Sequence, residues 1–422
     1  MPSTRLFVNF GAHFRSVVLP AATCALVVLL AACSGGSDDA GGDATAPTND
    51  TLTGLARYAG VQACEACHKE IYDDYIKTSH FRSSAHADLE SIHGSFEEGR
   101  NIYQGQENRR FAMLTSRDGQ PYQAEEYKQR DYWLRREAHH FDIVIGSGKK
   151  GQTYLFWMDS LLYQLPISYN VAADTWILSP GYTDEMANFR RPVGPRCIEC
   201  HGSYLEPKES RFKVGNMYDR ETLVLGISCE KCHGPAANHV QFHQAHPQEK
   251  TAKHIVNPPD VSRQRQLDVC ALCHSGHHTA IKPTFGWEMG AALDSFLLRE
   301  PFDPEVKMDV HGNQVGLFMQ SKCFQESPDM TCTTCHDMHK NEVGQTKTFS
   351  QRCLNCHTVD MCNMAPQVGE ETAADNCIDC HMPNGKSDVL LMQVGKDMEA
   401  LVVRTHHIAV YPQASEAFIR AH

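Results

Sequence analysis

Seven copies of the pattern Cys-x-x-Cys-His run through the chain and take 14 of its 18 cysteines. Cys-x-x-Cys-His is the attachment signature of a c-type haem: the two thiols bond to its vinyl groups, and the histidine ligates the iron. The predicted attachment cysteines are Cys64, Cys67, Cys197, Cys200, Cys229, Cys232, Cys270, Cys273, Cys332, Cys335, Cys353, Cys356, Cys377 and Cys380. The predicted iron ligands are His68, His201, His233, His274, His336, His357 and His381.

Two other uses of paired cysteines explain less of this pattern. Zinc sites contain Cys-x-x-Cys pairs, but they need no histidine directly after each second cysteine. Disulfides suit an exported chain, but they also leave the recurring histidine unexplained. The sequence therefore predicts a c-type cytochrome with seven covalently attached haem c groups.

The second axial position of each iron decides between electron transfer and chemistry on a bound substrate. A second strong ligand closes the iron, whereas an open position admits a substrate. The chain has 24 histidines, and 16 remain after His13 and the seven motif histidines are set aside. These are enough to close every iron, so electron transfer is the expected function and no catalytic residue is assigned.

The first 32 residues are predicted to be a lipoprotein signal peptide. Two arginines precede an uncharged, almost wholly apolar run at residues 16–32, which is too short and too close to the N-terminus for a membrane helix. The run ends in Leu-Ala-Ala-Cys, which resembles the lipobox of bacterial lipoproteins and implies lipidation of Cys33. Ser34 in place of a retention aspartate implies export to the outer membrane. An ordinary cleaved signal, with Cys33 spare, is the alternative.

Composition and charge restrict the partners. Residues 33–55 are predicted to be a flexible tether, because residues 34–49 hold no large apolar side chain. The formal net charge of the whole chain is −12, and it becomes more negative when the two arginines of the signal are removed. Such a negative protein is not expected to bind nucleic acid. A basic redox partner protein fits this charge, although the charge also serves solubility. Haem c is attached outside the cytoplasmic membrane, so the expected location is the cell envelope, lipid-anchored at the outer membrane.

The haem motifs divide the folded chain into three parts. Residues 56–99 form the first haem segment, and residues 191–422 form a hexahaem domain. Between them, residues 100–190 are rich in aromatic and β-branched runs, with a hairpin signal at Asp118-Gly119. We expect about five antiparallel strands there. The loop at residues 146–151 is Gly-rich, but it lacks phosphate-loop spacing and is predicted to be a turn.

The haem content sets the expected fold class. Seven haems in the 390 residues left after the signal leave too little chain for a helical domain around each haem. The macrocycles must then supply much of the core, with short helices and loops around them. We predict a mostly α fold with much irregular structure: a multihaem cytochrome c body with an inserted antiparallel β module. Expected helices cover residues 69–78, 236–246 and 286–298.

Several local patterns resemble the multihaem cytochrome superfamily that contains the tetrahaem cytochrome of ammonia oxidisers and hydroxylamine oxidoreductase. Multihaem proteins fused to tetratricopeptide repeats are the most similar members. The matching pieces lie between residues 60 and 410: Thr78-Ser79-His80, Cys-His-Gly-Pro with His239-Val240, Cys-His-Asp-Met-His339, Cys-Ile-Asp-Cys-His-Met-Pro and His406-His407-Ile408. The resemblance implies that His80, His239, His339 and His406 are second axial ligands to haems other than their nearest.

Several ligand assignments stay open. His243 competes with His239, and His407 competes with His406. The remaining irons are left to His277, His278, His311, His86 and His140.

Between the sixth and seventh motifs the relatives carry histidine, whereas this chain has Met361, Cys362 and Met364. Either methionine is a possible iron ligand or simply a buried side chain. Cys323 and Cys362 lie outside the seven motifs. They are compatible with a disulfide between them or, less commonly, with a thiolate ligand to iron.

Three functions are compatible with the sequence. The first is an electron conduit through packed haems. The second is an oxidoreductase acting on a small nitrogen or sulfur compound at one open haem, although no motif carries the lysine variant found at the nitrite reductase active site. The third is a binding role in which the β module docks a redox partner or an outer-membrane pore.

Overall fold

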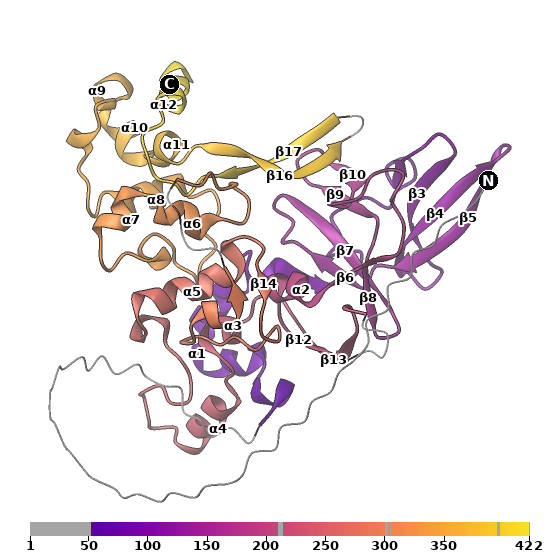
Figure 1. The fold of residues 1–422 in the computed structure, drawn as a ribbon, viewed down its shortest axis with the longest axis horizontal. Coiled ribbons are helices and arrows are strands. Elements are labelled where there is room, and N and C mark those ends of the chain that lie inside the picture. Colours follow the sequence, from indigo (N-terminus) through magenta and orange to yellow (C-terminus); the bar gives the residue numbers. More distant parts are fainter. Residues whose placement is uncertain (1–51, 210–213, 300–302, 304, 395–396, 422) are drawn as a thin grey trace, which may run out of the picture. The chain divides into compact units, whose positions relative to one another are not determined.

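The structure is a computed structural model that describes residues 52–209, 214–299, 303, 305–394 and 397–421. The described residues belong to one compact unit, Asp43–His422, shown in Figure 1. The predicted signal peptide, the lipidation site Cys33 and nearly all of the predicted tether lie outside the described residues.

Helix and strand are nearly balanced, with 31% of the chain helical and 26% in strands, so the prediction of a mostly α fold is wrong. Most helices are short, and α2, α3 and α11 hold little more than one haem motif each. The α-helices are α1 (Val61–Tyr75), α2 (Pro195–His201), α3 (Cys229–His233), α4 (Ala237–Ala245), α5 (Arg263–His274), α6 (Gln314–Met319), α7 (Lys322–Glu326), α8 (Thr346–Cys353), α9 (Ala365–Val368), α10 (Glu370–Asp375), α11 (Ile378–His381) and α12 (Pro412–Ala421). The 3₁₀ turns are η1 (Gly54–Arg57), η2 (Phe81–Ser83), η3 (Pro258–Asp260), η4 (Leu293–Ser295), η5 (Cys332–Thr334) and η6 (Val359–Met361).

The paired strands that the structure describes are all antiparallel. A four-stranded sheet has the order β2-β3-β4-β5, and a larger sheet has the order β1-β6-β7-β8-β11, with β9 pairing both β7 and β10. Their strands are β1 (Ser84–His86), β2 (Ile102–Gln104), β3 (Arg109–Thr115), β4 (Pro121–Gln129), β5 (Tyr132–His140), β6 (Ile143–Ile145), β7 (Gly151–Met158), β8 (Leu161–Gln164), β9 (Ile167–Asn170), β10 (Thr175–Leu178) and β11 (Arg191–Pro192).

Residues 100–190 hold β2 to β10, which is more than the five strands expected. The Asp118-Gly119 signal lies in the turn between β3 and β4, where Gly119 adopts φ +82°. Residues 146–151 join β6 to β7 and then enter β7, so they form a turn as predicted. Strand number was underestimated because several strands are only three or four residues long and show too few alternations to be recognised.

Two apolar cores lie against these sheets. The first is dominated by aromatic side chains from β3, β7, β9 and β10, with Tyr154, Phe156 and Phe189 almost fully buried. The second contains Ile143 and Leu162 of the larger sheet together with Ile198, which lies inside the second haem motif. The second core therefore fixes that motif directly against the sheet.

Three further hairpins lie outside residues 100–190. They are β12 (Gly202–Pro207) with β13 (Tyr218–Leu225), β14 (Thr279–Ala280) with β15 (Leu297–Leu298), and β16 (Asn384–Val394) with β17 (Asp397–Arg404). The hairpin β16–β17 contacts β10 of the larger sheet, beside which it lies in Figure 1. These hairpins are a main reason why the α prediction fails.

The helix predicted for residues 286–298 is absent. That stretch forms η4 and β15, and Gly290 adopts φ +96°, a backbone conformation that interrupts a helix. By contrast, the helix predicted for residues 236–246 is present as α4. The helix predicted for residues 69–78 is the C-terminal part of α1, which starts earlier and ends at Tyr75.

Truncating the aromatic core should destabilise the protein. Phe156 is 1% exposed and its ring contacts those of Tyr163, Phe189 and His139. We expect Phe156→Ala to lower the free energy of unfolding by about 3–5 kcal/mol, measured as a shift in the urea midpoint by circular dichroism. Tyr132→Ala on β5 is the control, because Tyr132 is 73% exposed and its loss should cost less than about 0.5 kcal/mol. Equal effects of the two substitutions would contradict the packing described.

Candidate haem-binding centre

Most of the haem motifs lie on or at the end of a short helix. In α1, α2 and α3 the motif lies within the helix, and α5 ends with the fourth motif. The fifth begins with η5, the sixth starts at the last residue of α8, and the seventh covers α11. A helical turn places residues i, i+3 and i+4 on one face, which are the positions of the two cysteines and the histidine. None of the fourteen motif cysteines forms a disulfide in the structure.

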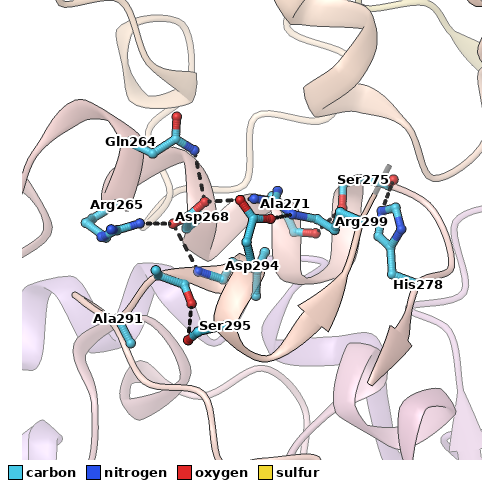
Figure 2. Close-up of polar contacts among 12 residues, drawn as sticks. Gln264, Arg265, Asp268, Ala271, Ser275, His278, Ala291, Asp294, Ser295 and Arg299 are labelled. Carbon is cyan, nitrogen blue, oxygen red and sulfur yellow. Dashed lines mark hydrogen bonds and ion pairs between the residues drawn. The ribbon is translucent and has the colours of Figure 1, made fainter. Parts of the chain in front are cut away.

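A buried carboxylate anchors the helix of the fourth motif, as Figure 2 shows. Asp268 precedes Cys270 by two residues on α5 and is fully buried. Its Oδ2 accepts a 2.7 Å bond from Arg265 Nη1 and a 3.3 Å bond from the backbone N–H of Leu293 in η4. Its Oδ1 accepts a 3.0 Å bond from Gln264 Nε2 and lies 3.5 Å from Arg299 Nη2. These bonds offset the cost of burying the charge and fix α5 against η4.

Three histidine pairs each join a motif histidine to one of the predicted second ligands. In each pair the two residues come from distant parts of the chain. The ring centres are 6.0 Å apart for His80 with His274, 6.1 Å for His233 with His339, and 6.2 Å for His336 with His406.

This spacing fits a metal ion held between two imidazoles. A bond from a metal to an imidazole nitrogen is about 2 Å long, so two axial imidazoles on opposite sides of one ion have ring centres roughly 6 Å apart. The residues present therefore fit haem iron with two histidine ligands at the third, fourth and fifth motifs.

Hydrogen bonds orient several of these rings. When Nδ1 lies against a carbonyl oxygen, which only accepts, Nδ1 carries the proton and Nε2 keeps the lone pair that a metal needs. The pairs of this kind are His233 with Val256 O at 3.0 Å, His381 with Ala409 O at 2.9 Å and His239 with Lys253 O at 2.8 Å. His274 Nδ1 lies 3.2 Å from Gln314 Oε1, which serves the same purpose.

Burial keeps His80 and His406 neutral. It lowers the pKa of His80 to about 4, and the neighbouring His274 and His336 add to the shift. Burial also lowers the pKa of His406 to about 4, again with a contribution from His336. Neutral imidazole is the form that ligates metals, so both residues are in the correct state for iron at neutral pH.

His239 and His243 lie one turn apart on α4, with ring centres 4.6 Å apart. Burial lowers the pKa of His239, and His68 of the first motif is among the charges that act on it, so α4 faces that motif. Nε2 of His243 is buried and has no hydrogen-bond partner among the described residues. Both side chains are therefore available to an iron at the first motif, and the choice between them stays open.

His311 is the ligand candidate that sequence reasoning did not single out. It lies close enough to His201 of the second motif to lower the pKa of that ring electrostatically, after the larger effect of burial. His311 also contributes, after burial, to the lowered pKa of His274, which already pairs with His80. No resemblance or spacing distinguished His311 from its competitors, because the turn that carries it is distant in sequence from the second motif.

The other open histidines are held in different surroundings. His278 Nε2 lies 2.7 Å from Ser275 O, and His140 packs against Tyr122 on the four-stranded sheet. His407 lies 3.2 Å from the hydroxyl of Tyr411. For His357 of the sixth motif, the part of the chain that the structure describes offers no ring contact to another histidine.

Thiols of different motifs touch one another. In each contact a hydrogen bond between the two thiols lowers the pKa of one and raises that of the other. The contacts are Cys64 with Cys229, Cys200 with Cys273, Cys270 with Cys332, and Cys353 with Cys377. They bring together the first and third, second and fourth, fourth and fifth, and sixth and seventh motifs.

The two leftover cysteines lie beside different motifs and are free thiols. Burial raises the pKa of Cys335 in the fifth motif, and the charge of Cys323 adds to that shift. Burial likewise raises the pKa of Cys323, with a contribution from Cys356 of the sixth motif. Cys362 acts on Cys380 of the seventh motif. The suggested disulfide between Cys323 and Cys362 is thus not formed in the structure. Met361 is 64% exposed, so it is not the buried methionine considered above.

Comparisons with known proteins agree with the motifs. The family model of cytochrome c554 and c-prime matches residues 63–110 and 181–234, which hold the first three motifs. The multiheme cytochrome MtrA of Shewanella baltica (strain OS185) is 24% identical over 204 residues, covering 47% of this chain and 48% of that protein. The chain thus spans about half the length of this curated relative. No solved structure matches the chain.

The motifs and the comparisons together support a multihaem c-type cytochrome that binds haem c and transfers electrons through haems. Haem supplies one-electron chemistry, and the chain supplies attachment, axial ligands and surroundings. Within the described residues, no helix is both long enough and apolar enough to cross a membrane.

Removing a second ligand should open one iron. We expect His339→Ala to convert one haem from low spin to high spin in the electron paramagnetic resonance spectrum, with the haem content unchanged, because His339 faces His233. His140→Ala is the control, since His140 lies on β5 against Tyr122. A spectrum of His339→Ala that stays entirely low spin would show that His339 is not an iron ligand.

Proposed function

We propose that this protein is a heptahaem cytochrome that passes electrons along closely packed haems at the cell envelope. The three pairs of a motif histidine with a histidine outside the motifs carry the proposal, because each pair would supply one iron with a ligand on each side. An iron closed in this way exchanges electrons without binding a substrate.

The contacts between motifs support a connected set of haems. A thioether sulfur lies at the edge of its macrocycle, so touching sulfurs from two motifs bring two haem edges together. The four thiol contacts join the first motif to the third, the second and fifth to the fourth, and the sixth to the seventh. Electrostatic effects connect further motifs. Cys232 of the third motif contributes to the raised pKa of Cys270 in the fourth, and Cys356 of the sixth contributes to the raised pKa of Cys335 in the fifth.

The location and partners belong to the same proposal. The N-terminal lipobox-like sequence before Cys33 supports a lipid anchor at the outer membrane, and the chain's formal charge of −12 favours a basic redox protein as partner. The flexible composition of residues 34–49 gives such an anchor a tether.

A second candidate function is catalysis at the sixth haem. His357 shares the lack of a facing histidine ring in the described residues with His68, His201 and His381, so the sequence after it distinguishes it: Met361, Cys362 and Met364 stand where relatives carry histidine. An iron without a second strong ligand would bind a small nitrogen or sulfur compound. This candidate requires one open iron, whereas the electron conduit requires none.

Haem counting and spin state test both functions. We expect the purified protein to carry seven haems, all low spin in the oxidised state. The double variant with Cys353→Ser and Cys356→Ser, which lacks both attachment cysteines of the sixth motif, should carry six. Cys362→Ser is the control and should keep seven, because Cys362 lies outside every motif. A stoichiometric high-spin signal that nitrite or hydroxylamine perturbs would favour catalysis instead. Fewer than seven haems in the unaltered protein would contradict the heptahaem assignment.

The anchor is tested by one substitution. We expect Cys33→Ser to move the protein from the membrane fraction to the soluble fraction and to remove the fatty acids seen by mass spectrometry on the unaltered protein. The thiol of Cys33 is the predicted acylation site, and two or more acyl chains are needed for stable anchoring. Cys323→Ser serves as the matched control. Membrane retention of Cys33→Ser would contradict the lipid anchor.

A further inference from the structure

We propose that Glu230, a residue inside the third haem motif, positions the first haem motif and the helix α4 relative to the third. The proposal rests on haem at the first and third motifs, as in the proposed function. Glu230 lies between Cys229 and Cys232 and is 3% exposed. A carboxylate so buried is costly unless hydrogen bonds compensate for its lost hydration.

Three backbone N–H groups supply those bonds. Oε1 accepts 2.8 Å bonds from the N–H groups of Ala59 and Ala236, and Oε2 accepts a 3.1 Å bond from that of Gly60. The bond to Gly60 joins residues 170 positions apart in the chain. Bonds from three amides to one carboxylate are charge-assisted and set its position closely.

Two of these amides mark the starts of helices. Gly60 is the N-cap of α1, and Ala236 is the N-cap of α4. The N–H groups of these two N-cap residues have no partner within their helices, and the carboxylate of Glu230 accepts a hydrogen bond from each. Its negative charge also suits the positive end of each helix dipole.

The two helices carry the groups that surround the first haem. The first motif begins on α1 at Cys64, and α4 presents His239 and His243 on the side of His68. The thiols of Cys64 and Cys229 touch where these segments meet. One side chain of the third motif therefore fixes the attachment helix of the first motif, the helix of its candidate second ligand, and the edge contact between the two motifs.

A second buried carboxylate provides a matched control. Glu199 lies inside the second motif, is also 3% exposed, and bonds to Arg196 and to the backbone N–H of Phe285. None of these partners belongs to another haem motif. Replacing Glu199 removes a buried charge from a haem motif without releasing the first motif.

Glu230→Gln and Glu230→Asp separate position from charge. The amide of glutamine has a single acceptor oxygen, so at least one of the three N–H groups loses its partner. Aspartate keeps the charge but is one methylene shorter. We expect both variants to bind the full number of haems and to show amide hydrogen exchange about tenfold faster at the start of α1 or α4.

The deciding measurement is a potentiometric titration of the holoprotein, read by visible absorption and electron paramagnetic resonance. Both Glu230 variants should shift the midpoint potentials of the same two haems, namely those missing when Cys64 and Cys67, or Cys229 and Cys232, are replaced by serine. Glu199→Gln should leave those two potentials unchanged. A merely structural role would lower the unfolding midpoint without moving individual potentials.

Other outcomes overturn the proposal. Unchanged potentials in both Glu230 variants would show that the carboxylate does not position the haems. A shift in Glu230→Gln alone, with Glu230→Asp like the unaltered protein, would show an effect of charge and not of position. If the unaltered protein lacks haem at the first or third motif, the proposed function fails, a result that the haem count shows independently of any Glu230 variant.

Discussion

Histidine pairs drawn from distant parts of the chain are the contacts on which the rest of the structure depends. His80 follows the first motif and faces the fourth, His339 follows the fifth and faces the third, and His406 near the C-terminus faces the fifth. Each such pair closes a long loop of chain, and the cost of closing it rises only slowly with loop length. A chain of short helices and hairpins can therefore reach a single arrangement without a large helical core.

The β part of the chain serves the same arrangement. Its second core includes Ile198, between the cysteines of the second motif, so one haem-binding turn is packed against the larger sheet rather than left on a loop. Buried carboxylates act in a similar way at Glu199, Glu230 and Asp268, because each lies in or beside a motif and bonds to backbone distant in sequence. Rigid support of this kind keeps functional groups at fixed separations.

The sequence predicts a multihaem c-type cytochrome, which the comparisons support, but it predicts the wrong fold class. The attachment cysteines are predicted from spacing alone and His80, His339 and His406 from a resemblance; they stay predictions, and the structure places each of these three histidines about 6 Å from a motif histidine. The mostly α prediction failed because β12–β13 lies between the second and third motifs and β16–β17 follows the seventh, where short helices and loops were expected.

Other features were beyond the reach of local patterns. Residues 286–298 look helical, but the turn at Gly290 and the bond from Leu293 to Asp268 favour an irregular path. His311 was one of five candidate ligands and could not be singled out, and Glu230 was not considered, because the surroundings of each depend on tertiary neighbours: His201 for His311 and the first motif for Glu230.

The thiol contacts also have a consequence for biogenesis. Before haem is attached, a chain folded as described would hold Cys64 against Cys229 and Cys353 against Cys377 as free thiols. In an oxidising compartment, neighbouring thiols are prone to join as disulfides, and each such bond would cross-link two different motifs and block both. Keeping these thiols reduced until haem is attached therefore protects both motifs of each pair.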